Sequence, residues 1–110
     1  MKKQPLNPDC PINATIRILG GKWKVLILFH LNQGTKRFNE LRRGMPGVTQ
    51  RMLTNQLREL ETDKIISRKV YPEVPPRVEY TLTAIGKTLT PVLEALQKWG
   101  ACYIRKISNE

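Results

Sequence analysis

The order of apolar and polar residues predicts two helices in the first third of the chain. Pro11 stands where the first turn of a helix tolerates proline, and apolar residues follow at helical spacing until Gly20-Gly21. Residues 22–32 predict a second helix that is apolar nearly all round. A helix of that kind lies in the middle of a domain.

Shorter elements come next. Residues 35–38 are long enough only for a strand stub, and residues 39–43 predict a short third helix. Glycine and proline in residues 44–47 then force a tight turn. Thr49 is the expected N-cap of a fourth helix, which runs to about Thr62.

This fourth helix has one apolar and one polar face. At 100° per residue, its core face consists of Met52, Leu53, Gln56, Leu57 and Leu60. The opposite face carries amide, hydroxyl and guanidinium groups in its first turns, on Gln50, Arg51, Thr54, Asn55 and Arg58. Acidic residues come only at the C-terminal end of the helix.

The last third of the chain predicts a hairpin and two helices. Residues 65–74 and 77–82 have strand-like composition, with Pro75-Pro76 at the expected hairpin tip because proline cannot donate to a ladder. Thr83 is predicted to cap a short helix, and Thr90-Pro91 to cap a longer one. A near-heptad apolar stripe, longer than a small domain can easily cover, consists of Ile85, Leu89, Val92, Leu96, Trp99, Tyr103 and Ile107.

The charge of the chain favours a polyanionic partner. The 110 residues carry 19 Lys and Arg against 9 Asp and Glu, a formal net charge of +10. Residues 36–58 hold six basic residues and one acidic residue, whereas residues 59–82 hold four basic and five acidic. Nucleic acid is the simplest partner for such a chain, and on charge alone a ribosomal protein fits equally well.

Several protein classes are excluded. The longest apolar run, residues 25–29, is far shorter than the roughly 20 residues of a membrane span. Polar and proline residues occupy positions 5–9, where a signal peptide needs an apolar stretch, and two cysteines make no disulfide framework. We therefore expect a cytoplasmic protein. Because no catalytic, metal-binding or phosphate-loop pattern is present, we predict no enzyme activity, no metal and no cofactor.

The arrangement of the elements predicts how nucleic acid would be bound. A short helix, a turn and a polar-faced helix make a helix-turn-helix, and a hairpin directly after it makes a winged helix. The expected fold is thus mainly α with a small β-hairpin (α+β). Gln50, Arg51, Thr54 and Asn55 are residue types that read base edges in the major groove, so the partner predicted is double-stranded DNA.

Several runs in order carry a family resemblance. They are Cys10-Pro11, residues 20–23 (GGKW), residues 36–43 (KRFNELRR), the helix 50–61 and the wing run 74–83 (VPPRVEYTLT). Over roughly residues 10–100 the chain resembles the HxlR-type family of bacterial winged-helix transcription regulators, relatives of the MarR group. Lys64 stands where the family more often has glycine, and His30 where it has arginine.

The resemblance implies a homodimer held by its terminal helices on a two-fold operator. It divides the chain into a flexible arm (1–9), a winged helix-turn-helix domain (10–89) and a C-terminal dimerisation helix (90–110). The expected phosphate contacts are Arg37, Asn39 and Arg58, with Lys36 and Thr49 beside them; Arg42 and Arg43 are equally well explained as solubilising charge. Arg77 is the expected wing arginine in the minor groove.

Other interpretations stay open at this point. Cys10, at a helix start, is either a redox- or electrophile-sensing thiol, as in some relatives, or a structural cysteine. The effector is unknown, because nothing in the sequence marks a small-molecule pocket. The alternative function is a winged-helix module that binds nucleic acid nonspecifically, or a protein partner.

Overall fold

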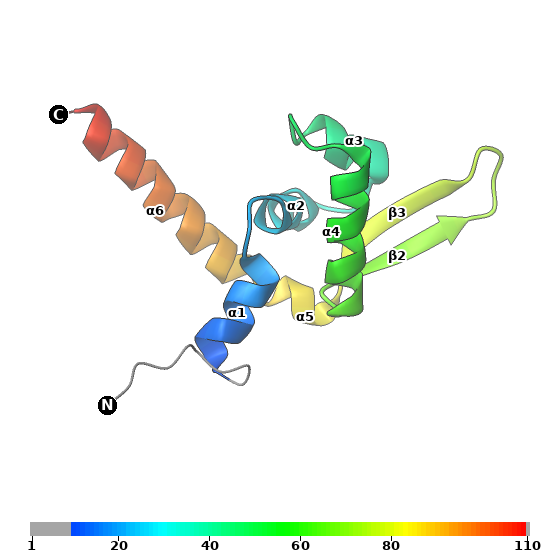
Figure 1. Cartoon of the computed structure of the whole chain (residues 1–110), viewed down its shortest axis with the longest axis horizontal. Helices are drawn as coiled ribbons and strands as arrows, with labels where there is room; N and C mark the ends of the chain where they lie inside the picture. Colours follow the sequence, from blue (N-terminus) through cyan, green and yellow to red (C-terminus); the bar gives the residue numbers. More distant parts are fainter. Residues whose placement is uncertain (1–9, 110) are drawn as a thin grey trace.

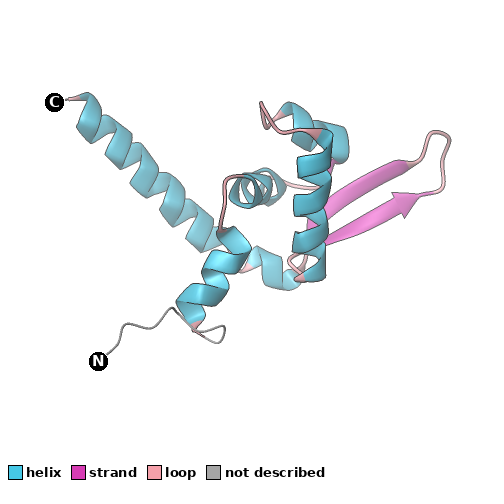
Figure 2. Cartoon of the chain, in the orientation of Figure 1, coloured by secondary structure: helices cyan, strands magenta, loops and turns pink. Residues whose placement is uncertain are grey.

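A computed structural model describes residues 10–109 (Figure 1). Over that range the chain forms six helices and three strands, in the order α1 (Pro11–Leu19), α2 (Trp23–Asn32), β1 (Lys36–Arg37), α3 (Phe38–Arg43), α4 (Gln50–Thr62), β2 (Ile66–Tyr71), β3 (Arg77–Leu82), α5 (Ala84–Lys87) and α6 (Thr90–Ser108). The expected mainly helical fold with a small β-hairpin is confirmed (Figure 2). The predicted arm, residues 1–9, lies outside the described residues.

The three strands form one antiparallel sheet in the order β1-β3-β2. In the hairpin, Ile66 pairs with Leu82 and Tyr71 pairs with Arg77, and the strand stub places Lys36 opposite Tyr80. The prolines lie in the loop of residues 72–76, as predicted. The first strand ends at Tyr71, however, and its predicted extension to residue 74 is wrong, because Pro72 cannot donate to the ladder.

The hydrophobic core surrounds α2, which Figure 1 shows end-on between α4 and the pair α1 and α6. Ile27 and Leu28 of this helix are fully buried, in agreement with its predicted central position. From α4 the predicted core residues Leu53, Leu57 and Leu60 pack against it. The apolar face of α4 is therefore fixed to the body of the domain, and its polar face is turned outward.

Both ends of α4 are closed by local hydrogen bonds. The Oγ1 of Thr49 accepts from the amide of Met52 at 3.1 Å, so the predicted N-cap is confirmed. At the other end the amide of Lys64 donates to Glu61 O and that of Ile65 to Leu60 O, both at 3.0 Å. This is a Schellman motif, in which residue 64 needs a left-handed backbone, and Lys64 has φ +64°.

The C-terminal helices differ from the prediction in two details. Thr83 caps α5, but Thr90 does not cap α6: the N-cap is Leu89, and Thr90 bonds to Asn32 instead. Leu89 also packs against the core rather than continuing the exposed stripe, and the residue of α6 that is fully buried is Leu93. The first turn of α6 thus belongs to the core, and the rest of the helix projects away from the body (Figure 1).

Candidate nucleic-acid interface

Helices α3 and α4 and the turn between them form the helix-turn-helix. Gly44 ends α3 and lies under the His30 ring, whose Nε2 is 3.1 Å from the Gly44 carbonyl oxygen. A β-carbon on Gly44 would come within 2.6 Å of that ring. His30 of α2 therefore fixes the turn from which α4 begins.

The N-terminal half of α4 presents the predicted polar face to solvent. The predicted residues Gln50, Arg51, Thr54, Asn55 and Arg58 line one open hollow of about 570 Å³. Acidic side chains of the same helix are set back and paired, Glu59 with Lys24 and Glu61 with Arg68. The exposed part of α4 is thus a surface of hydrogen-bond donors and acceptors with positive charge.

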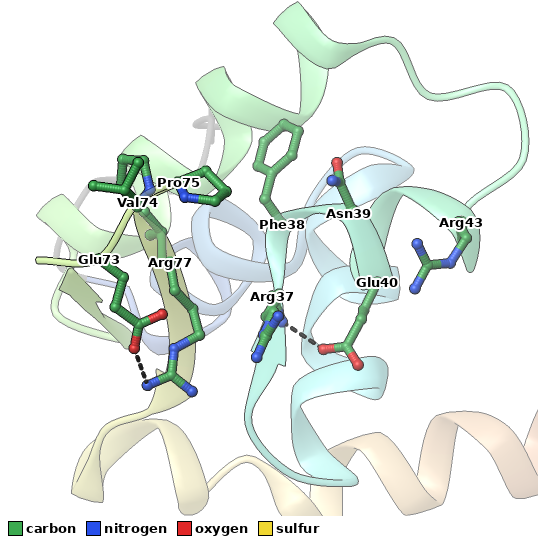
Figure 3. A pocket seen from close by; sticks show the side chains of 11 residues that line it. Arg37, Phe38, Asn39, Glu40, Arg43, Glu73, Val74, Pro75 and Arg77 are labelled. Atoms are coloured by element: carbon green, nitrogen blue, oxygen red, sulfur yellow. Dashed lines mark hydrogen bonds and ion pairs between the residues drawn. The ribbon is translucent and has the colours of Figure 1, made fainter. Parts of the chain in front are cut away.

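A second opening lies between the start of α3 and the wing, defined here as residues 71–77. It has a volume of about 720 Å³. Figure 3 shows Arg37, Asn39 and Arg43 on its helix side, with Glu73 and Arg77 on its wing side. Two carboxylates also line the opening, Glu40 bonded to the amide of Arg37 and Glu73 paired with Arg77. The basic and amide groups of Arg37, Asn39 and Arg43 at the edge of the helix-turn-helix are of the kinds that contact a phosphate backbone.

The predicted phosphate-contact residues occupy different positions around these openings. Arg37 is the exposed N-cap of α3, and its amide donates to Glu40 Oε1 at 2.7 Å. Asn39 is exposed in the first turn of α3, whereas Lys36 is half-buried on β1. Thr49 uses its oxygen as the cap of α4, which leaves the hydroxyl proton free to donate.

Arg77 is held inside the wing. Its Nη2 lies 3.1 Å from Glu73 Oε2, and its Nη1 lies 3.3 Å from Glu79 Oε2. The guanidinium carbon is 3.8 Å from the centre of the Tyr71 ring. Two carboxylates and an aromatic face thus hold a side chain that the sequence analysis assigned to the minor groove, while its Nε is buried without a hydrogen-bond partner.

Cys10 is half-buried at the start of α1, the place at which the sequence analysis expected it. Its carbonyl oxygen accepts from the amide of Ala14 at 2.9 Å, while its thiol makes no cap hydrogen bond. Cys102 lies on α6, also half-buried, and both thiols are free.

Sequence reasoning missed a basic extension of the site on β2. Arg68 is exposed and lines a small hollow of about 170 Å³ beside α4 together with Arg58, Glu61 and Tyr80, and its guanidinium is paired with Glu61. Lys69 is also exposed but points to the other face of the strand. Burial raises the pKa of the Tyr80 phenol above its ordinary value of 10.0, against the opposing effect of the nearby charges of Arg68 and Arg58. The signal for this extension was the basic residue Arg68 in the strand that follows α4.

The fold and the site define a winged helix-turn-helix transcription regulator. The family model described as HxlR-like helix-turn-helix matches residues 18–108. The chain belongs to this family, and the resemblance on which the sequence analysis relied is confirmed.

Relatives with curated names agree with this assignment. The HTH-type transcriptional regulator YdeP of Bacillus subtilis (strain 168) is 55% identical over 100 residues, which cover 91% of this chain and 78% of YdeP. An HTH-type transcriptional regulator of Methanothermobacter thermautotrophicus is 53% identical over 94 residues, 86% of this chain and 72% of that protein.

Solved structures show the same fold. The redox regulator HypR in its reduced form has a TM-score of 0.85 and 48% identity, covering 91% of this chain and 99% of that chain. The oxidised form of HypR has a TM-score of 0.81 and 53% identity, covering 84% of this chain and 96% of that chain.

Among the described residues of our chain, no helix combines the length and the apolar character that a membrane span needs.

Proposed function

We propose that the protein binds a two-fold DNA operator as a homodimer and thereby regulates transcription, with α4 in the major groove. The observation that carries this proposal is the exposed, basic and amide-rich N-terminal half of α4, held rigidly by its apolar face. A major groove admits one α-helix, and such helices contact bases with their N-terminal residues. Because the proposed partner is DNA, we expect the protein to act in the cytoplasm.

Four residues are proposed to read the bases. Arg51 suits guanine, since its guanidinium can donate two hydrogen bonds to O6 and N7. Gln50 and Asn55 suit adenine, and the hydroxyl of Thr54 suits either. Their common hollow supports this assignment, because side chains that line one surface can contact the same short run of base pairs.

The contacts to the sugar-phosphate backbone surround these four residues. We assign them to Arg58 on α4, Thr49 at its cap, Arg37 and Asn39 at the edge of the wing opening, and Lys36 on β1. Such contacts position a protein on DNA without reading its sequence.

For Arg77, insertion into the minor groove stays a prediction. The geometry favours a different role, since insertion would require the guanidinium to leave both carboxylates and the Tyr71 ring. We propose that Arg77 holds the shape of the wing beside the DNA.

The homodimer is supported by apolar side chains that no part of the described chain, residues 10–109, covers. On α6 the predicted stripe is exposed from residue 92 onward, and Trp99 stacks on Tyr103 with ring centres 5.2 Å apart. On α1, Ile12 and Ile16 are 60% and 54% exposed. A second copy that covered these two helices would remove these exposed apolar side chains from water.

A response to thiol oxidation is proposed for Cys10. HypR, the structural neighbour described above, is a redox regulator whose oxidised and reduced forms are both known. Cys10 is the N-cap of α1, a helix that we place in the dimer interface. Oxidation of its thiol would therefore change how the two subunits are oriented to one another. The test is operator affinity of the wild type and Cys10→Ser with and without diamide; identical responses of the two proteins would contradict this role.

Selection from a random duplex library tests the DNA-binding proposal as a whole. The wild-type protein should enrich a two-fold site with half-sites about 10 base pairs apart, bound at least about 10³-fold more tightly than a scrambled duplex. Equal affinity for the enriched and the scrambled duplex would instead support the alternative, a nonspecific nucleic-acid or protein-binding module.

A further inference from the structure

Lys24 is a buried charge between three helices. The residue lies on α2 and is 8% exposed. Its Nζ lies 2.7 Å from Oε1 of Glu59 on α4 and donates a longer hydrogen bond, 3.4 Å, to the carbonyl oxygen of Arg17 on α1. The Lys24 side chain is 10% exposed and that of Glu59 56% exposed, so the ammonium is the buried end of the pair and depends on both partners for its hydrogen bonds.

The partners of Lys24 belong to helices with different proposed tasks. Helix α1 carries the exposed residues Ile12 and Ile16 and contributes no fully buried side chain to the core. Helix α4 carries the proposed base-reading residues. A second, weaker link joins the same two helices, because Arg17 Nη2 lies 3.9 Å from Asp63 Oδ1. Ile18 and Leu19 pack α1 against the core, and the contacts of Lys24 and Arg17 add a polar connection between α1 and α4.

We propose that Lys24 is a positioning residue that fixes the angle of the recognition helix relative to α1. A shift of α1 at the subunit interface moves the Arg17 carbonyl, and the ammonium transmits that shift to Glu59. The inference rests on the proposed function in one respect, the reading of DNA by α4. The contacts of Lys24 that connect the helices are present without DNA.

A DNA-free measurement isolates this link. Spin labels on Thr15→Cys and Asn55→Cys, in a chain whose native cysteines are serine, report the distance between α1 and α4. Dilution with excess unlabelled chain restricts the measurement to one subunit. Lys24→Met and the double variant Lys24→Met/Glu59→Gln should broaden or shift the distance distribution, whereas Lys24→Arg, which keeps the charge, should leave it narrow.

The neighbouring ion pair provides a matched control. Glu61 lies two residues after Glu59, on the other side of α4, and pairs with Arg68 of β2 at 3.6 Å, so it links α4 to the sheet and not to α1. Glu61→Gln should leave the distance between the labels unchanged. If Lys24→Met/Glu59→Gln also left it unchanged, with the melting temperature reporting an intact fold, the inference would be wrong.

A second experiment measures DNA binding by the same double variant, here without spin labels. Lys24→Met/Glu59→Gln removes one charge of each sign, so its affinity for scrambled duplex should equal that of the wild type, while affinity for the selected duplex falls about tenfold. An unchanged affinity for the selected duplex would contradict a positioning role. If the wild type itself shows no preference among duplexes, the proposed function fails, while the distance measurement still decides the inference.

Discussion

The guanidinium of Arg77 lies over the ring of Tyr71, 3.8 Å from its centre, directly across the register of the hairpin. The same group bridges Glu73 and Glu79. One side chain thus connects the loop of the wing to both of its strands. To contact DNA, Arg77 would have to give up its contacts with Glu73, Glu79 and Tyr71.

Replacing Arg77 with glutamine separates the two roles of this residue. If Arg77 holds the wing, Arg77→Gln should raise amide hydrogen exchange of the free protein across residues 70–78 by about tenfold, because these contacts no longer restrain the hairpin. The slope of log affinity against log salt should change by much less than one per subunit. A loss of about one unit of slope per subunit, with amide exchange unchanged, would instead indicate direct contact with DNA.

Lys64 has a left-handed backbone, φ +64°, at the end of α4. This conformation costs an L-residue about 1–2 kcal/mol, and part of the gain from glycine is offset by the greater freedom of the unfolded chain. Lys64→Gly should therefore stabilise the protein by about 0.5–1 kcal/mol, measured as a melting temperature higher by roughly 3–5 °C.

Lys64→Ala is the control for this prediction, since it removes the long side chain and keeps the β-carbon. Alanine should give no comparable gain. Equal melting temperatures for the glycine and alanine variants would show that backbone conformation is not the cause.

If the exposed half of α6 forms the dimer interface, removing it should change the oligomeric state of the protein. A chain that ends after Gln97 keeps the buried Leu93 but loses Trp99, Tyr103 and the apolar residues beyond. Sedimentation velocity should show a folded monomer for this chain and a dimer for the full chain. Lys98→Gln, a change beside the stripe, should leave the dimer intact; a truncated chain that still sedimented as a dimer would contradict the proposed interface.

Local patterns predicted most of the fold. The cap at Thr49, the two faces of α4 and the prolines of the hairpin tip depend on neighbouring residues, and the structure confirms all three. The stripe on α6 was less predictable because apolar residues lie on adjacent faces of the helix. Leu89 and Leu93, one turn apart, face the core, and spacing alone does not distinguish them from Val92 and the exposed residues that follow.

The candidate site was predictable only where one helix supplies it. The residues of α4 share a face by periodicity, so their common surface follows from spacing alone. The partners of Lys24 come from other helices, and no local pattern indicates that Glu59 approaches Lys24. Arg77 and Glu79, by contrast, lie two residues apart on β3 and so share a face of the strand, a pairing that spacing could have indicated. Tertiary packing decides which charges remain free for DNA.

The central claim is that the exposed face of α4 reads sequence, and Arg51 and Arg58 test it as a matched pair. Both are exposed arginines lining the same hollow. Arg51→Ala should reduce affinity for the selected duplex by about 1–3 kcal/mol and affinity for a scrambled duplex much less. Arg58→Ala should weaken both duplexes alike and lower the salt slope by about one unit.

The most direct measurement is therefore the ratio of affinities for selected and scrambled duplex, determined for the wild type and both alanine variants at one salt concentration. The account predicts that the ratio falls by about tenfold or more in Arg51→Ala and stays at the wild-type value in Arg58→Ala. An Arg51→Ala protein that bound both duplexes more weakly by the same factor, and so kept the wild-type ratio, would contradict it.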